Sequence, residues 1–219
     1  MPETVITVQG GHDAYYPAER AVVTVAIAFE GPERTDVVAR TTAGTRALVA
    51  GIVDRHHPDN GPVTWYATDR IQVWSHRPFN DKGEQVPLVH HAQTSTRAKF
   101  RDFDELAGWV ERAAAYPGVR VDGIEWSLTE KTRLGAVNAV RTRAVEEARA
   151  KAQTYAEALG LSGLRCIAIA DPGLLGDTGA TPGYQPAACS RQAKDAGGLA
   201  FTPEDIAVSA AVDARFVAS

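Results

Sequence analysis

The sequence has few cysteines, little excess charge and no long apolar run, and each shortage excludes a class of protein. Only Cys166 and Cys189 are present, too few for a disulfide framework and without the close spacing of a redox or zinc pair. The net charge is -4 and the pI about 5.9, so no basic field favours nucleic acid. Apolar runs such as Ala21–Phe29 fall short of the roughly 20 residues of a membrane helix. We therefore expect no nucleic-acid partner and no membrane span.

The N-terminus and the composition predict a soluble globular protein. Met1-Pro2-Glu3-Thr4 leads directly into apolar alternation, without the charged, apolar and cleavage segments of a secretory signal, so we expect a cytoplasmic location. Of the 219 residues, 44% are hydrophobic and 23% charged, which suffices for a sizeable core. We expect one domain over residues 1–219. A division into two intimately packed halves, about 1–116 and 117–219, stays open.

Hydrophobic periodicity predicts strands and helices in both hairpin and single-strand arrangements. Helices are expected after Gly31-Pro32-Glu33, after Asp102, which with Glu105 resembles a capping box, and from about residue 130 to Gly160. The second helix presents Leu106, Trp109, Val110 and Ala113, and the third has an apolar stripe from Leu134 to Leu159. Charged residues off that stripe, such as Arg143 and Glu146, indicate a solvated helix face. The expected strands are Thr4–Val8, Ala18–Phe29, Val63–Trp74, Val86–Phe100, Val119–Leu128, Leu164–Ala170 and Ile206–Val217. In the second of these, Val23, Val25, Ile27 and Phe29 share one face, and the turn at 80–83 joins the third and fourth in a hairpin. This order favours an α+β fold with a mixed or mostly antiparallel sheet and helices packed on one face.

Three local features carry more specific expectations. Gly10-Gly11 should stop or bend the first strand, and Gly123 marks a bulge. Leu164–Ala170 is short and apolar, so it should lie inside the sheet with Cys166 in the core. The Gly- and Pro-rich segment 171–199 is expected to be a flexible loop.

Several segments, in this order, resemble the SIMPL-domain (YggE-like) family. They are Ile6-Thr7-Val8-Gln9-Gly10, then 121–128 (VDGIEWSL), 144–152 (AVEEARAKA), 156–161 (AEALGL) and the terminal strand 206–216 (IAVSAAVDARF). The corner at 17–21 (PAERA) departs from the family's usual form. The resemblance implies an α+β fold, homo-oligomers including ring- or channel-like assemblies, and a link to envelope or oxidative stress without an established reaction.

No combination of residues indicates catalysis or a cofactor. His56-His57 and His90-His91 are adjacent pairs, and neighbours in a strand point to opposite faces, so His90 and His91 should not share a metal. No His-x-x-x-His, Cys-x-x-Cys or Gly-x-Ser-x-Gly motif occurs, and the glycines at 173 and 176 lack the lysine of a phosphate-binding loop. We expect a non-enzymatic protein without cofactors or metal.

Aromatic and histidine residues on the predicted strands are the candidate contact surface. Packing in the core is the competing interpretation. Our leading hypothesis is self-association, with 63–100 and the Gly/Pro-rich loop as contact surfaces, and the alternatives are a small-molecule- or metal-binding cleft, or a hydrolase or redox enzyme that needs His76, His90 or Cys189. The candidate interface or ligand-groove residues are Trp65, Tyr66, Trp74, His76 and His90.

Overall fold

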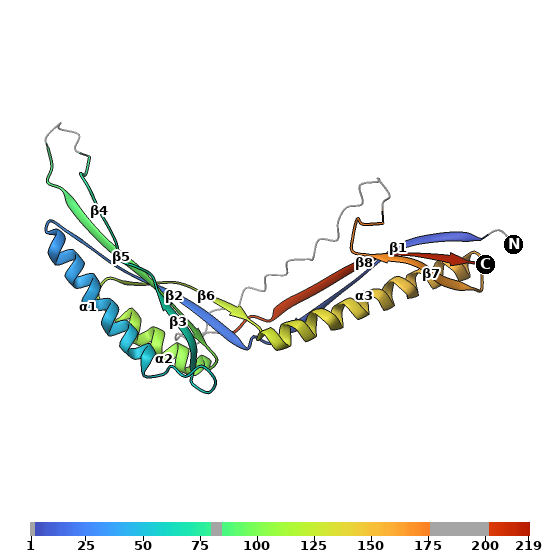
Figure 1. Cartoon of the computed structure of the whole chain (residues 1–219), viewed down its shortest axis with the longest axis horizontal. Coiled ribbons are helices and arrows are strands. Elements are labelled where there is room, and N and C mark those ends of the chain that lie inside the picture. The colour runs from blue at the N-terminus through green and yellow to red at the C-terminus, as the bar shows by residue number, and fades with distance from the viewer. Residues whose placement is uncertain (1–2, 80–84, 176–201) are drawn as a thin grey trace. The chain divides into compact units, whose positions relative to one another are not determined.

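The computed structural model describes residues 3–79, 85–175 and 202–219, which form helices and antiparallel sheets (Figure 1). The helices are α1 (Arg34–Val53), α2 (Phe103–Ala114) and α3 (Glu130–Ala158). The strands are β1 (Thr4–Tyr16), β2 (Arg20–Gly31), β3 (Val63–Thr68), β4 (Gln72–His76), β5 (Val89–Phe100), β6 (Val119–Ser127), β7 (Leu164–Ala170) and β8 (Ile206–Ala218). The predicted α+β class is confirmed.

The chain divides into two compact units that interleave in the sequence. One unit contains β1, α3, β7 and β8, and the other contains β2 to β6 with α1 and α2. Their bounds differ from the halves near 1–116 and 117–219, because β1 pairs along its whole length with β8 and not with the strand that follows it. The sequence also suggested one sheet, whereas each unit has its own.

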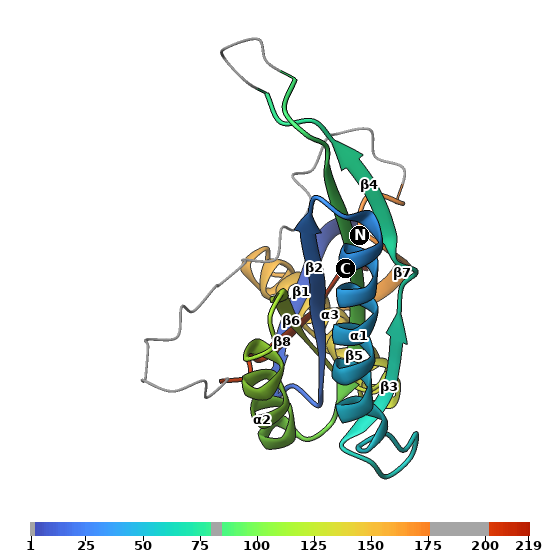
Figure 2. The same ribbon diagram turned by 90° about the vertical axis from the view of Figure 1, so that its left-hand side faces the viewer.

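The first of the two sheets has five strands in the order β3-β5-β2-β6, with β4 also pairing with β5. The succession β2, α1, β3 with β4, β5, α2, β6 is a split β-α-β arrangement of the ferredoxin-like type. Both helices lie on one face of this sheet (Figure 2). The predicted apolar face of β2 is confirmed, since Val23, Val25 and Ile27 are buried with Leu48, Ile52, Leu106 and Trp109.

Helix α2 is positioned as its sequence predicts. Asp102 caps it, because its side chain accepts from the N–H groups of Asp104 and Glu105 at 3.1 and 3.0 Å. Glu105 does not complete a capping box; its carboxylate accepts from Arg55 at 2.9 Å. The apolar residues expected to face the sheet are all buried: Leu106, Trp109, Val110 and Ala113.

The second sheet has three strands in the order β1-β8-β7, with α3 along one face (Figure 1). Alanines line the buried side of the helix, namely Ala136, Ala144, Ala148, Ala152 and Ala156, together with Val140. Small side chains let the helix approach β1 closely, and a Cβ on Gly10 would lie 2.1 Å from the Ala144 carbonyl oxygen. Strand β1 runs through Gly10-Gly11 without stopping, so the expected break is wrong. Gly10 serves close packing instead.

Two side chains of α3 hold the outer edge of β1. The backbone N–H of Gly11 donates to the Glu147 carboxylate, and Lys151 Nζ donates to the Gln9 carbonyl at 2.8 Å. Glu147 and Lys151 also form an ion pair at 3.4 Å. These bonds occupy edge groups that another strand would otherwise pair with.

Strand β7 does not lie inside the sheet, as the sequence suggested, but at its edge. Cys166 is exposed and not in the core, and Ile167 and Ile169 are 43% and 51% exposed. The short apolar run therefore reflects an uncovered edge strand. The ends of the predicted α3 stripe are also wrong, since Leu134 and Leu159 are exposed. Gly160 closes the helix with a φ of 73°, as predicted.

The remaining boundaries differ from the sequence analysis in detail. The run Val63–Trp74 is two strands, β3 and β4, which both pair with β5. The bulge predicted at Gly123 is present beside it, where the register of β2 with β6 shifts between Thr24 and Val25. The turn at 80–83, Cys189 and most of the segment 171–199 lie outside the described residues. Among the described residues, no helix has the length and apolarity to span a membrane.

Candidate functional site

One face of the five-stranded sheet carries no helix of its unit, and cross-strand register decides which side chains it presents. Paired residues of neighbouring strands share a face, and successive residues alternate. Val23, Val25 and Ile27 face the helices, so their neighbours on β2 face the other way. Glu30 of β2 pairs with His91 of β5, which pairs with Trp74 of β4. We call this side of the sheet the open face.

The predicted site residues are divided between the two faces. Trp65, Trp74 and His76 lie on the open face. Tyr66 pairs with buried Ala98 and packs against the core on the helix side, and His90 pairs with Ser75 on that side too. The five residues therefore do not form one groove. Adjacent residues of a strand cannot share a face, which separates Trp65 from Tyr66.

His91 is at the centre of a ring cluster on the open face. Its Nε2 lies 2.8 Å from Nδ1 of His76, and the two ring planes are 26° apart. The indole of Trp74 stacks on the His91 ring with centroids 5.1 Å apart and planes 7° apart. Glu30 Oε2 lies 3.4 Å from His91 Nδ1. Only 16% of the His91 side chain is exposed, and Trp74, His76 and Glu30 all contact its imidazole.

Trp65 occupies the other end of the open face, among basic residues. It is 42% exposed and pairs with Lys99, and the Arg97 guanidinium lies 5.9 Å from its ring centroid. At this distance the cation is attracted by the face of the ring. The open face thus has Trp65 beside basic residues at one end and Trp74 near the acidic Glu30 at the other.

On the helix side of the sheet, Ser75 and His90 form the nearest approach to a nucleophile and a base. Ser75 Oγ lies 2.6 Å from His90 Nδ1; Ser75 is exposed on the edge strand β4, and His90 is half-buried on β5. The sequence neighbours Ser75 and His76 point to opposite faces, so their side chains do not form a pair. Catalysis by a serine also needs a group that orients the histidine and donors for an oxyanion.

Tyr66 lines a shallow groove between α1 and β3. The groove has a volume of about 570 Å³ and includes Val49, Val53 and Thr68. The ring of Tyr66 meets His56 edge-on, with centroids 5.1 Å apart. Aliphatic side chains of α1 share the lining with Thr45, Arg46 and Asp54, so the groove combines an apolar surface with polar groups.

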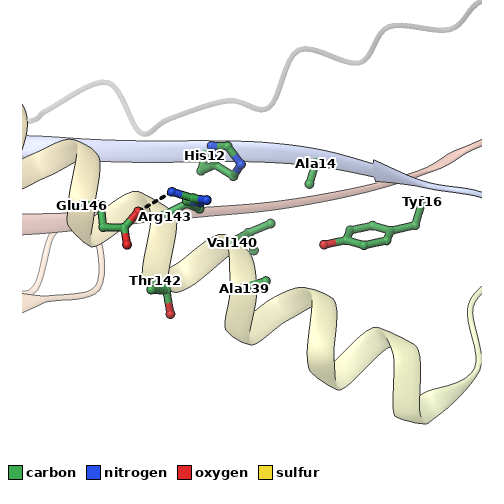
Figure 3. A pocket seen from close by; sticks show the side chains of 8 residues that line it. All are labelled: His12, Ala14, Tyr16, Ala139, Val140, Thr142, Arg143 and Glu146. Atoms are coloured by element: carbon green, nitrogen blue, oxygen red, sulfur yellow. Dashed lines mark hydrogen bonds and ion pairs between the residues drawn. The ribbon is translucent and has the colours of Figure 1, made fainter.

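A second cavity lies in the other unit, between β1 and the first half of α3 (Figure 3). Its volume is about 410 Å³, and its lining combines polar and apolar groups: His12, Ala14, Tyr16, Ala139, Val140, Thr142, Arg143 and Glu146. Arg143 and Glu146 form an ion pair at 2.8 Å on its rim. The helix lies close to β1 at Gly10, and the cavity is lined by the next three β1 residues on the same face, His12, Ala14 and Tyr16.

Sequence reasoning did not single out the central residues of the ring cluster on the open face or of the cavity beside β1. His91 was paired with His90 and set aside, although the register of a hairpin would place it opposite Trp74. Arg143 and Glu146 were interpreted as a solvated helix face, and His12 and Tyr16 were not considered as a group. The available signal was the alternation in β1, which places His12, Ala14 and Tyr16 on one face.

Two exposed ion pairs on the surface show pKa shifts with a clear physical cause. The hydrogen bond that Arg133 donates to Glu130 lowers the pKa of Glu130, and the one that Arg120 donates to Asp122 raises the pKa of Arg120, both at exposed surface pairs. Within residues 3–79, 85–175 and 202–219, no three His, Cys, Asp or Glu side chains converge to hold a metal ion.

The fold and surface features define an α+β protein made of two helix-backed antiparallel sheets, with an aromatic and histidine-bearing open face. The chain belongs to the SIMPL family, whose model is described as a protein of unknown function (DUF541) and matches residues 6–216. The suspected resemblance is therefore confirmed. No curated protein matches the chain.

Proposed function

We propose that this SIMPL-family protein is non-enzymatic and acts by associating with copies of itself through the open face of its five-stranded sheet. The observation that carries the proposal is the exposure of two tryptophans on that face, 42% for Trp65 and 45% for Trp74. Tryptophan is among the residues most enriched in the energetic centres of protein interfaces. A second molecule that covers the open face removes both indole rings from water.

The spacing of the tryptophans suits an interface of ordinary size. Trp65 pairs with Lys99 and Trp74 with His91, so they are eight positions apart along β5. At about 3.3 Å per residue this separates them by about 26 Å. A standard interface buries about 800 Å² per partner, a patch roughly 30 Å across. One partner surface can therefore cover both rings.

Charge along the open face favours a two-fold arrangement. Arg97 and Lys99 flank Trp65, and Glu30, whose side chain is 72% exposed, lies beside the Trp74 end. In a two-fold interface the same patch meets itself in the opposite sense. The basic end of one copy would then meet the acidic end of the other, which favours this pairing over a parallel one.

The non-enzymatic part of the proposal rests on what the polar groups do. Ser75 and His90 bond to each other at an exposed strand edge, where a reacting group would not be shielded from water. His91 is engaged by His76, Glu30 and Trp74. These arrangements fit surface networks better than an active site. The stress-related role suggested by the family resemblance remains part of this proposal and is independent of which face associates.

The test is the mass in solution measured by light scattering over a hundredfold range of concentration. Wild-type protein is expected to gain mass with concentration. Trp65→Ala and Trp74→Ala should each weaken association about 30-fold, which corresponds to the roughly 2 kcal/mol of an interface hot spot. Tyr155→Ala is the matched control, because Tyr155 is a 50% exposed aromatic residue on α3. A monomeric wild type, or an equal effect of Tyr155→Ala, would contradict the proposal.

The cavity in Figure 3 favours a second candidate function, the binding of a small molecule. Its volume of about 410 Å³ is in the range of ligand sites, and His12 and Tyr16 offer hydrogen-bonding groups beside the apolar surface of Ala139 and Val140. A thermal-shift screen with metabolites tests it, since a ligand of the folded state raises the melting temperature. A true ligand should lose its effect in Ala139→Trp, which fills the cavity. A screen without hits, or hits that survive this substitution, would count against it.

A further inference from the structure

We propose that His76 and His91 together bind a divalent transition-metal ion, with Glu30 as the outer partner that orients His91. The ion would be one that prefers imidazole, such as Zn²⁺, Ni²⁺ or Cu²⁺. The site uses two protein ligands from β4 and β5, and water fills the remaining positions. It is therefore a different kind of site from a cage of three or more side chains, and it does not depend on self-association.

The two ring nitrogens face each other across a short hydrogen bond. His91 Nε2 and His76 Nδ1 are 2.8 Å apart, with ring planes only 26° from parallel. Without a metal, a proton occupies the space between them. Bonds of about 2.0–2.1 Å at a tetrahedral Zn²⁺ place two nitrogens about 3.3 Å apart. The nitrogens therefore need to separate by about 0.5 Å. His76 is exposed and is the last residue of β4, so it can move by this amount.

Glu30 determines which nitrogen of His91 is free to bind. Its Oε2 lies 3.4 Å from His91 Nδ1, so the carboxylate favours the tautomer with the proton on that nitrogen. The lone pair is then on Nε2, which faces His76. A carboxylate that orients a ligating histidine in this way is common at metal sites and increases the basicity of the imidazole.

Trp74 fixes the ring of His91 and also provides a signal. The two rings stack with planes 7° apart and centroids 5.1 Å apart, which restricts rotation of the imidazole before any ion binds. Because Ni²⁺ and Cu²⁺ quench nearby indole fluorescence, an ion held by His91 would quench Trp74. The other tryptophans, Trp65, Trp109 and Trp126, lie on different elements and serve as an internal reference.

Other histidines of the described residues are engaged differently. His57 Nδ1 accepts from the backbone N–H groups of Asp59 and Asn60 at 3.3 and 3.1 Å, which occupies the nitrogen that would bind. His90 points to the opposite face, where Nδ1 bonds to Ser75 Oγ at 2.6 Å. His90 is thus a matched control one residue from His91 in the same strand.

The experiment is a titration of tag-free protein with Zn²⁺ by calorimetry and with Ni²⁺ by tryptophan fluorescence. We expect one site per chain. His76→Gln and His91→Gln should each weaken binding at least tenfold, and Glu30→Gln about tenfold, at the lower end of the effect of outer partners because Glu30 is exposed. His90→Gln should bind as wild type. Trp74→Phe should bind Zn²⁺ normally and lose most of the Ni²⁺ quenching.

The outcomes separate this site from general surface binding and from the proposed interface. Circular dichroism of each variant shows whether it folds, and Trp65→Ala, which leaves the histidine pair intact, allows the titration on a dissociated chain. Equal affinity in wild type and His91→Gln would overturn the proposal. No binding of Zn²⁺ at millimolar concentration, or equal loss in His90→Gln, would overturn it too.

Discussion

Replacing Gly10 with alanine should separate α3 from β1 and destabilise the three-stranded unit. A Cβ at this position would lie 2.1 Å from the Ala144 carbonyl oxygen and 2.5 Å from the Ala148 nitrogen. Both are backbone atoms of a continuous helix, so no side-chain rotation relieves the overlap. Ordinary van der Waals contact begins at about 3.4 Å. The helix must therefore move by about 1 Å or more, or β1 must bend away.

The loss of stability comes from the gap that this movement opens between α3 and the sheet. Ala144 and Ala148 are fully buried against the sheet, where they pack with Ile6, Val8 and Phe216. A gap of 0.5–1 Å already loses a quarter to a half of each atomic contact. Overpacking of this kind costs about 1–3 kcal/mol of stability. Because the overlapping atoms belong to the helix backbone and cannot rotate away, we expect Gly10→Ala to lie at the upper end, about 3 kcal/mol. The double variant Gly10→Ala/Ala148→Gly should not recover stability, because it removes a Cβ and leaves the backbone atoms.

The assay is urea unfolding, monitored by circular dichroism at 222 nm and by tryptophan fluorescence. The circular dichroism signal measures helix content, to which α3, the longest described helix, contributes. All four tryptophans lie in the five-stranded unit, whereas circular dichroism reports on α1 and α2 of that unit and also on α3 of the other. Unfolding confined to the three-stranded unit therefore changes the circular dichroism and leaves the tryptophan fluorescence unchanged. Gly135→Ala is the control: this α3 glycine has nothing within 4 Å, and alanine there should stabilise by about 1 kcal/mol. If Gly10→Ala were neutral, or rescued by Ala148→Gly, the close-packing argument would be refuted.

Three further predictions test local interactions. Asp102→Ala should cost about 1 kcal/mol in urea unfolding, because its carboxylate accepts from two N–H groups of α2, and Asp102→Asn should retain most of the stability; equal losses would contradict this. Thr41→Val should cost about 1 kcal/mol, since the fully buried hydroxyl donates to a carbonyl of its own helix at 2.9 Å; an unchanged midpoint would contradict it. In an NMR titration the pKa of Glu130 should lie below its usual value and rise in Arg133→Gln; stability from this pair is present above the unfolded-state pKa and is lost as pH falls through the folded-state pKa.

Much of the fold was accessible from the sequence because local chemistry decides it. The alternation in β2 predicted its buried face, Asp102 and the stripe of α2 predicted that helix and its contacts, and Gly160 predicted where α3 ends. Each of these depends on residues within a few positions of one another. The order of such segments was also sufficient to indicate the SIMPL family, which the match over residues 6–216 confirms.

The candidate site was less accessible, because it depends on register. Of the five candidate residues, Trp65, Trp74 and His76 lie on the open face, Tyr66 and His90 lie on the other face, and His91 was not among them. Which residue of β4 stands opposite His91 is set by the hairpin, whose turn lies outside the described residues. A shift of one position would reverse every face, so composition alone could not identify the cluster.

By itself, the sequence determined the class of fold, the positions of its helices and the apolar face of β2, since these follow from periodicity and capping within short segments. The tertiary structure decided that β1 joins β8, that β7 is an edge strand with Cys166 exposed, and that Gly10 serves a close helix contact. These features are pairings between segments as far apart as the two ends of the chain. Local propensity cannot specify them, because the energy that selects a partner comes from surfaces that meet only after folding.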